Sequence, residues 1–291
     1  MRPGPRPGKR LSGAAFLALV AICFVWAANA VLLRHAVGPG QLPPVWLAAG
    51  RFLVAGLCLS PLLRRRPDRF PLVLAAGFLM GAGHFGLLML GYARLDSSTA
   101  ALILQLGTPA TALISMLAGA ERWSMPRLGL VAMATLAVVL AIGAEQGGAD
   151  PVGVALIIGS ALSLSLGSVL IKGTGRASAI QMQAWTSAVS ALVLACLAPL
   201  LEPRGLPLLA AQPLLSAVAI LCPAIVVTLG AHTAYYALLK GNDPSSVAGM
   251  TLLFPLFTIM LGVTVLGEVV GPSFWIGGGL ALLCVLALAR R

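Results

Sequence analysis

Residues 97–121 read SSTAALILQLGTPATALISMLAGAE, and residues 245–268 read SSVAGMTLLFPLFTIMLGVTVLGE. Each stretch is an apolar run that contains one proline and ends at a glutamate. In both cases a short break and a second apolar run follow. The two prolines lie 146 positions apart and the two glutamates 147 positions apart. The sequence therefore predicts an apolar block that occurs twice in the chain.

The composition indicates a membrane protein. Hydrophobic residues make up 59% of the 291 positions and charged residues only 9%. A soluble fold needs far more polar surface than this. A membrane-spanning helix needs roughly 20 apolar residues. Ten stretches of suitable composition are present: 12–33, 44–63, 70–92, 97–119, 126–144, 151–172, 179–201, 214–239, 245–266 and 272–289. We therefore expect an all-α polytopic membrane protein with ten transmembrane helices.

The positive charges predict the orientation of the chain. Most of the 19 Lys and Arg residues fall on one side if the ten stretches cross the membrane in turn. By the positive-inside rule, that side is cytoplasmic and holds both termini. The net charge of +11 is then explained mainly by basic residues that orient the chain in the membrane and, to a lesser extent, by contact with membrane lipid. No nucleic-acid partner is expected. The predicted location is the bacterial inner (plasma) membrane.

Further matches extend the repeat over the whole chain. Residues 31–34 (VLLR) match 169–172 (VLIK), and Trp46 matches Trp185. The predicted units are residues 1–145 and 151–291, five spans each, joined by a linker at 146–150. Because five is odd, the second unit enters the membrane in the opposite sense, as in secondary transporters with inverted repeats. The two halves together need no second chain, so a monomer is expected.

Several motifs resemble the drug/metabolite transporter superfamily, and in particular its EamA-type members. These motifs are Trp26 followed by Asn29, the pair Arg51-Phe52, and the segments that run from Pro109 to Glu121-Arg122 and from Pro255 to Glu268. The resemblance implies ten helices, cytoplasmic termini, a central cavity, and export of amino acids or related metabolites. Aromatic amino acids are one candidate group of substrates.

The polar residues inside the spans are the candidate binding residues, because a polar group in hydrocarbon is costly. His84, Leu88 and Tyr92 share one helical face at spacings of four residues. That face could line a cavity, or His84 could instead bond to a neighbouring helix. In the second half, His232 begins a similar face with Tyr236, which could alternatively belong to an interfacial aromatic belt.

Other candidates lie on the first and sixth spans. Trp26 and Asn29 share a face of the first span, and Asn29 needs a partner in a helix, water or ligand. Ser163 and Ser168 could line a polar path or bond to carbonyls of their own helix. Arg51 is the one intramembrane cation of the sequence; it could pair with a substrate carboxylate, extend toward the interface, or bond to helix carbonyls.

Pro109 and Pro255 are predicted hinges, since a proline frees a backbone carbonyl inside a helix. A passive kink is the alternative. The five cysteines form no Cys-x-x-Cys pair, so we expect neither a metal site nor a cofactor.

The sequence favours a secondary transporter that exports small metabolites, most of all amino acids with apolar side chains. No Asp or Glu lies in the middle of a span, which argues against a carboxylate as coupling group. A broad exporter of drugs or toxic compounds is the alternative within transport. An intramembrane hydrolase built on Ser160 is the alternative as an enzyme, but the sequence lacks Gly-x-Ser-x-Gly, and we expect no catalytic residues.

Overall fold

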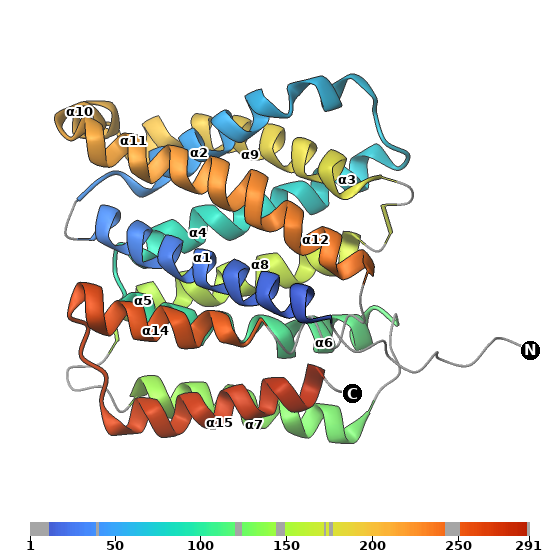
Figure 1. The fold of residues 1–291 in the computed structure, drawn as a ribbon, viewed down its shortest axis with the longest axis vertical. Helices are drawn as coiled ribbons and strands as arrows, with labels where there is room; N and C mark the ends of the chain where they lie inside the picture. The colour runs from blue at the N-terminus through green and yellow to red at the C-terminus, as the bar shows by residue number, and fades with distance from the viewer. Residues whose placement is uncertain are drawn as a thin grey trace, which may run out of the picture.

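The computed structural model describes residues 12–38, 41–119, 124–143, 149–171, 173–174, 177–241 and 251–289, and these residues form helices and connecting turns (Figure 1). The first half contains α1 (Gly13–Val37), α2 (Pro44–Cys58), η1 (Ser60–Arg64), α3 (Phe70–Phe78), η2 (Leu79–Gly83), α4 (His84–Tyr92), α5 (Ser97–Leu104), α6 (Gly107–Leu117) and α7 (Met125–Gly143). The second half contains α8 (Pro151–Ile171), α9 (Ala179–Leu201), α10 (Gly205–Ala211), α11 (Pro213–Cys222), η3 (Pro223–Ala231), α12 (His232–Gly241), α14 (Leu253–Leu266) and α15 (Pro272–Ala289).

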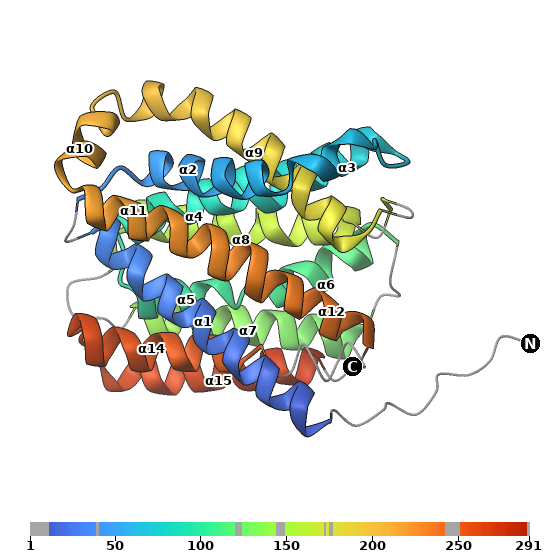
Figure 2. The same ribbon diagram turned by 45° about the horizontal axis from the view of Figure 1, so that its top comes forward.

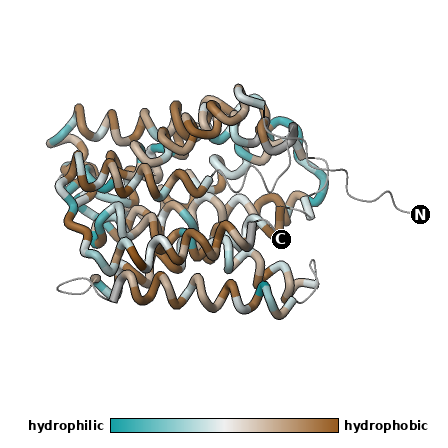
Figure 3. The backbone as a smooth tube through the Cα atoms, turned by 60° about the horizontal axis from the view of Figure 1, so that its bottom comes forward, coloured by the Kyte–Doolittle hydropathy of each residue, from teal (hydrophilic) through white to brown (hydrophobic). Residues whose placement is uncertain are grey.

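The helices have the length and composition of membrane spans. Within the described residues, six continuous helices are long and apolar enough to cross a bilayer, and four shorter apolar helices accompany them. Many large apolar side chains face outward, including Leu57, Leu200, Leu214 and Ile276. Hydrophobic residues predominate along the helices (Figure 3). Such a surface is stable in lipid and not in water. The protein is therefore an all-α membrane protein, while a count of ten spans stays a prediction.

Corresponding helices of the predicted halves run in opposite directions. The end of α1 adjoins the 92–96 turn, where the Arg34 guanidinium donates to the carbonyl oxygen of Tyr92 (3.0 Å). The start of α8 adjoins the same turn, since Gly153 packs against Arg94 and Leu95. One helix therefore ends where its counterpart begins, as an inverted repeat requires.

Helices of each half also pack against helices of the other half. Helix α1 packs against α14 of the second half, and α8 packs against α5 and α6 of the first half. Helices α2 and α9 pack side by side, and α7 pairs with α15 at one edge of the bundle (Figures 1 and 2). Each half is thus covered by helices from the other, so the interface between them runs through the centre of the molecule.

Two of the long helices contain a wider π-helical segment. The first, η2, covers Leu79–Gly83, and the second, η3, covers Pro223–Ala231. Each ends immediately before a histidine, His84 in one half and His232 in the other. Such π segments inside longer helices are frequent at functional sites. The structure therefore places both predicted histidines at matching irregularities.

Two glutamates, the buried Glu268 and the half-buried Glu202, hold one end of the bundle together. Glu268 accepts hydrogen bonds from the backbone N–H groups of Ser97 (2.6 Å) and Ser98 (3.0 Å) at the start of α5. Glu202 accepts from the N–H groups of Val45 (3.0 Å) and Trp46 (3.2 Å) at the start of α2. We call this end of the molecule the glutamate end. At each contact a residue of the second half caps a helix of the first.

Candidate substrate site

The predicted face of α4 is buried inside the bundle. His84, Leu88 and Tyr92 are 7%, 6% and 2% exposed. The ring Nδ1 of His84 lies 2.7 Å from Oγ of Ser160 on α8 and 3.2 Å from the carbonyl oxygen of that serine. The Ser160 hydroxyl also donates to the His84 carbonyl oxygen (2.9 Å). His84 therefore makes the interhelical bond that was one of its two predicted roles.

The serines of α8 also bond to backbone carbonyls. Ser163 donates to the carbonyl oxygen of Leu79 in η2 (2.8 Å), and Ser168 donates to that of Leu164 in its own helix (2.7 Å). The Leu79 carbonyl lies in the π segment, where the regular helical hydrogen-bond ladder is interrupted. Ser163 thus supports the irregular part of the third span, whereas the hydroxyl of Ser168 forms its hydrogen bond within its own helix.

Trp26 of α1 meets the aromatic side chains of α12. Its ring centroid lies 5.4 Å from that of His232 and 5.2 Å from that of Tyr235, both edge-on. The structure thus joins Trp26 and His232, two candidates 206 positions apart in the sequence. Tyr235 was not among the predicted site residues. The side chain of its neighbour Tyr236, which was predicted, lies outside the described part of the structure.

Two polar atoms on this face of α1 have no hydrogen-bond partner among the described residues. Nε1 of Trp26 and Oδ1 of Asn29 are buried, and neither forms a hydrogen bond with any described residue. A buried polar atom without a partner costs about 1–3 kcal/mol, so native proteins contain few of them. One donor and one acceptor are therefore available here for a bound molecule.

Arg51 of α2 is enclosed by both halves of the protein. The residue is 3% exposed, and its Nε donates to the Thr228 hydroxyl on η3 (3.0 Å). The guanidinium carbon lies 4.0 Å from the ring centroid of Phe85 on α4. Arg51 therefore does not extend toward the interface, which excludes one of its predicted roles. Its Nη2 is buried and has no hydrogen-bond partner among the described residues.

These side chains belong to a common region of the bundle. Helix α1 contacts both α4 and η3, and α2 contacts the same two elements. Arg51 itself contacts both elements, through Phe85 next to His84 on α4 and through Thr228 on η3. We call Trp26, Asn29, Arg51, His84 and His232 the central polar cluster. It draws on both halves of the chain and lies at their interface.

The two predicted hinge prolines sit at helix starts. Pro109 is in the first turn of α6 and Pro255 in the first turn of α14, and both are buried. In a first turn the missing N–H of proline costs nothing, because that group has no intrahelical acceptor. The break between α5 and α6 falls at Gln105 and Leu106, just ahead of Pro109. A gating role for the prolines stays a prediction.

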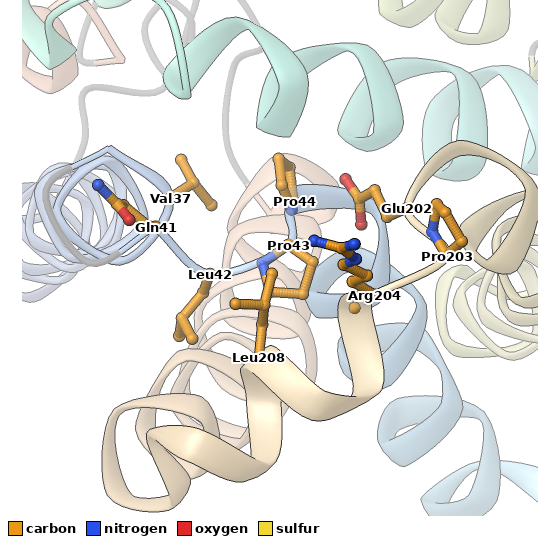
Figure 4. Close-up of a pocket in the computed structure, with 10 residues that line it drawn as sticks. Val37, Gln41, Leu42, Pro43, Pro44, Glu202, Pro203, Arg204 and Leu208 are labelled. Atoms are coloured by element: carbon orange, nitrogen blue, oxygen red, sulfur yellow. The ribbon is translucent and has the colours of Figure 1, made fainter.

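A pocket of about 480 Å³ opens at the glutamate end, between the α1–α2 and α9–α10 connections (Figure 4). Glu202 lies beside Pro44, the first residue of α2. Burial raises the pKa of the Glu202 carboxyl above 4.5, although the hydrogen bonds from Val45 and Trp46 act to lower it. The pocket is mostly apolar in its lining, which includes Val37 and Leu208. It forms an external recess away from the central polar cluster.

Sequence reasoning left a substrate role for Arg51 as one of three alternatives, and it did not include Phe85, Thr228 or Tyr235 among the site residues. Arg51 carried a visible signal, because a cation inside an apolar span is rare. Thr228 and Phe85 carried none, since their importance comes only from their contacts with Arg51. Such contacts depend on helix rotation and packing.

Comparison with known proteins agrees with this architecture. A "Probable amino-acid metabolite efflux pump" of Salmonella typhimurium is 25% identical over 262 residues, which cover 87% of both chains. An "Uncharacterized inner membrane transporter YedA" of Escherichia coli K12 is 24% identical over 93% of this chain and 89% of the relative. A solved crystal structure shares the fold with a TM-score of 0.64, at 20% identity over 97% of this chain and 99% of the other. The model of the EamA-like transporter family matches twice, at residues 13–143 and 151–290, and the chain therefore belongs to the EamA-like transporter family.

Proposed function

We propose that this membrane transporter of small metabolites exports amino acids, with apolar or aromatic side chains preferred, across the bacterial inner membrane. The central polar cluster carries the proposal. It combines polar atoms of Trp26, Asn29 and Arg51 that have no hydrogen-bond partner in the described part of the chain with the rings of His232 and Tyr235 beside Trp26. Polar atoms fix the orientation of a small ligand, while apolar and aromatic walls supply contact area.

The arrangement of the halves supports alternating access. The cluster lies between helices of both halves, and these halves run in opposite directions through the bundle. Rocking of one half against the other would expose such a site to each side in turn. The relatives named an amino-acid metabolite efflux pump and an inner membrane transporter support the substrate class and the location. The proposed topology keeps both termini in the cytoplasm, as the positive-inside rule predicts.

A flux assay tests this proposal. Purified protein would be reconstituted in liposomes loaded with radiolabelled leucine, phenylalanine, threonine or lysine, with and without an imposed proton gradient. We expect efflux of leucine or phenylalanine well above that from loaded liposomes that contain no protein. The gradient tests coupling, since the described carboxylates lie at helix ends and leave the histidines as mid-span titratable groups. Absence of flux for every amino acid would reject the proposed substrate class.

A broad-specificity exporter makes a different prediction in the same assay. Exporters of apolar cations use a membrane-embedded acid to attract their substrate, whereas the charged residue of the central polar cluster is the cation Arg51, and the buried Glu268 lies at the glutamate end. Transport of quaternary ammonium dyes at rates equal to those of amino acids would favour that alternative. Arg51 instead favours substrates with a negative group, which leads to the next inference.

A further inference from the structure

We propose that Arg51 is the carboxylate-recognition residue of this transporter, and that substrates are required to carry a carboxylate. The inference rests on the proposed transport of amino acids and specifies which part of the substrate is recognised. It is drawn from the surroundings of the guanidinium, which supply a hydroxyl acceptor and an aromatic ring but, among the described residues, no anion.

Three features of Arg51 leave part of its side chain available. The Thr228 hydroxyl accepts the hydrogen bond of Nε. The Phe85 ring covers one face of the guanidinium at 4.0 Å, which is a favourable cation–π distance. Nη2 remains buried without an acceptor among the described residues. The guanidinium is therefore fixed in position while one of its nitrogen atoms is unused.

No described residue pairs with the charge of Arg51 in a salt bridge. The two salt bridges within the described residues, Arg34–Asp96 and Arg94–Asp150, lie at the helix ends and do not include Arg51. A buried cation is normally paired with an anion or coordinated by several acceptors. Thr228 and Phe85 are both neutral, so within the described part of the chain this positive charge has no anionic partner. A bound anion is the group that completes it.

A carboxylate fits this site better than a phosphate. Phosphate carries close to two charges and is bound by clusters of Arg and Lys, whereas Arg51 is the one cation in the central polar cluster. A carboxylate carries one charge and can accept two parallel hydrogen bonds from a guanidinium. Oδ1 of Asn29 and the ring of Trp26 lie on α1, which packs against α4 and η3, the two elements that contact Arg51. An amino group and an apolar side chain of the same substrate would find an acceptor and a wall there.

The location explains why the recognition residue could act in transport. Arg51 belongs to α2 of the first half, and its fixed partner Thr228 belongs to the π segment η3 of the second half. The bond between them crosses the interface that alternating access would rearrange. Binding of a carboxylate to Arg51 therefore places the substrate charge at the moving interface.

The test compares acids with their amides on the wild-type protein. Counterflow of radiolabelled phenylalanine would be inhibited by unlabelled phenylalanine, phenylalaninamide or 2-phenylethylamine, and the leucine series would be treated in the same way. A hydrogen bond to a charged group is worth enough to change affinity by roughly 10- to 100-fold. We expect each acid to inhibit at least about 10-fold more strongly than its amide. Equal inhibition by acid and amide would overturn the inference.

Variants at position 51 identify the residue responsible. In Arg51→Gln the preference for acid over amide should disappear, while Arg51→Lys should keep part of it, because the charge remains but the bidentate fork is lost. Size-exclusion elution and thermal unfolding in detergent would establish that each variant is folded. A folded Arg51→Gln protein that still prefers the acid would refute the role of Arg51. If that variant does not fold, the wild-type comparison and Thr228→Val, which removes the acceptor of Nε, still decide; Thr228→Val should lower the preference severalfold.

The outcomes separate this inference from the proposed function. Flux of the amines or amides without a preference for acids would leave a working transporter but reject carboxylate recognition. If acids are transported and substitutions at position 51 do not change the preference for acids, amino-acid export would still stand, but Arg51 would be rejected as the residue that recognises the carboxylate. Absence of flux for all of these solutes would reject the proposed function and, with it, the inference that depends on it.

Discussion

The carboxylate of Glu268 caps the first turn of α5, accepting hydrogen bonds from the backbone N–H and from the hydroxyl of Ser97. Ser98 makes the same pair of bonds to the other carboxylate oxygen. A negative group at a helix N-terminus is stabilised both by the free N–H groups and by the helix dipole. Because Glu268 follows α14 and Ser97 begins α5, this contact fastens the second half of the protein to the first.

Replacing Glu268 with alanine should destabilise the protein. The substitution leaves two buried N–H groups and two hydroxyls without their acceptor, and losing hydrogen bonds to a charged group costs roughly 2–3 kcal/mol. We expect a clearly lower midpoint of thermal unfolding in detergent. Glu268→Gln is the matched control, since its amide oxygen retains one acceptor and should give an intermediate loss. An alanine variant as stable as the wild type would show that the contact does not hold this end together.

Glu202 predicts a pH dependence of stability. Its pKa is raised above 4.5 mainly by burial, so the folded protein holds this proton more tightly than the unfolded chain does. The contribution of Glu202 to the free energy of unfolding is therefore full below pH 4.5 and is lost as the pH rises through the raised pKa. Unfolding midpoints of the wild type relative to Glu202→Gln should fall over that pH range. A difference that stays constant or increases with pH would contradict the assignment.

The fold was largely predictable, because the residues at which helices begin and end act locally in the sequence. The expected spans 179–201 and 272–289 coincide with α9, which lies between the caps Ser178 and Glu202, and with α15, which begins at Pro272. The π segments were not predicted, although the glycine-rich run at 81–86 marks one of them. Its conformation depends on tertiary packing, as shown by Gly81, which leaves room for Ser190 of α9. A run of apolar residues does not specify such contacts.

The site was predictable only in part. Trp26 and His232 were both candidates, but nothing in the sequence indicates that their rings lie 5.4 Å apart. His84 was a candidate for the cavity, yet its bond to Ser160 joins residues 76 positions apart. Helices that are apolar on every side do not reveal which face meets a neighbour. Partners across the bundle therefore had to come from the structure.

Gly277 lies at the contact between α7 and α15, and Gly279 of the same helix serves as a control position for substitutions at Gly277. A Cβ atom at Gly277 would lie 2.7 Å from the Ala137 carbonyl oxygen and 2.9 Å from Cα of Ala141. Gly277→Ala should therefore force the two helices apart and cost about 1–3 kcal/mol. Gly279 has nothing within 4 Å of that position, so Gly279→Ala should be neutral or stabilise by up to about 1 kcal/mol. Thermal unfolding in detergent measures both, and equal effects of the two substitutions would contradict the packing.

His84 and Ser160 should be energetically coupled. Single substitutions His84→Ala and Ser160→Ala each break the same interhelical contact, so the double variant should lose less than the sum of the two. Polar contacts between membrane helices are worth about 0.6 kcal/mol on average, and the coupling measured by unfolding should be of this order or larger. Additive losses would mean that the two residues act independently.

Flux through the same variants separates packing from binding and from catalysis. If His84 lines the path, His84→Ala should reduce amino-acid efflux with unchanged protein levels, whereas normal flux would assign the residue to packing. Ser160→Ala should retain transport, because its hydroxyl joins two helices and its side chain is fully buried. Loss of all flux in a folded Ser160→Ala protein would require a direct role for the hydroxyl and reopen the hydrolase alternative.

Asn29 should show opposite effects on stability and transport. Its Oδ1 is buried without a partner in the described structure, so Asn29→Leu, which has a similar volume, removes an unsatisfied polar atom and should leave stability unchanged or raise it by about 1 kcal/mol. The same change removes the acceptor proposed for the substrate amino group and should lower efflux at least about 10-fold. Trp26→Phe, which keeps an aromatic ring beside His232 but loses the Nε1 donor, should follow the same pattern with a smaller loss of flux. Ligand-binding sites commonly lower the stability of the folded protein, because their polar groups lack a hydrogen-bond partner until the ligand is bound. A variant that is destabilised yet transports normally would instead identify Asn29 as a bond between helices.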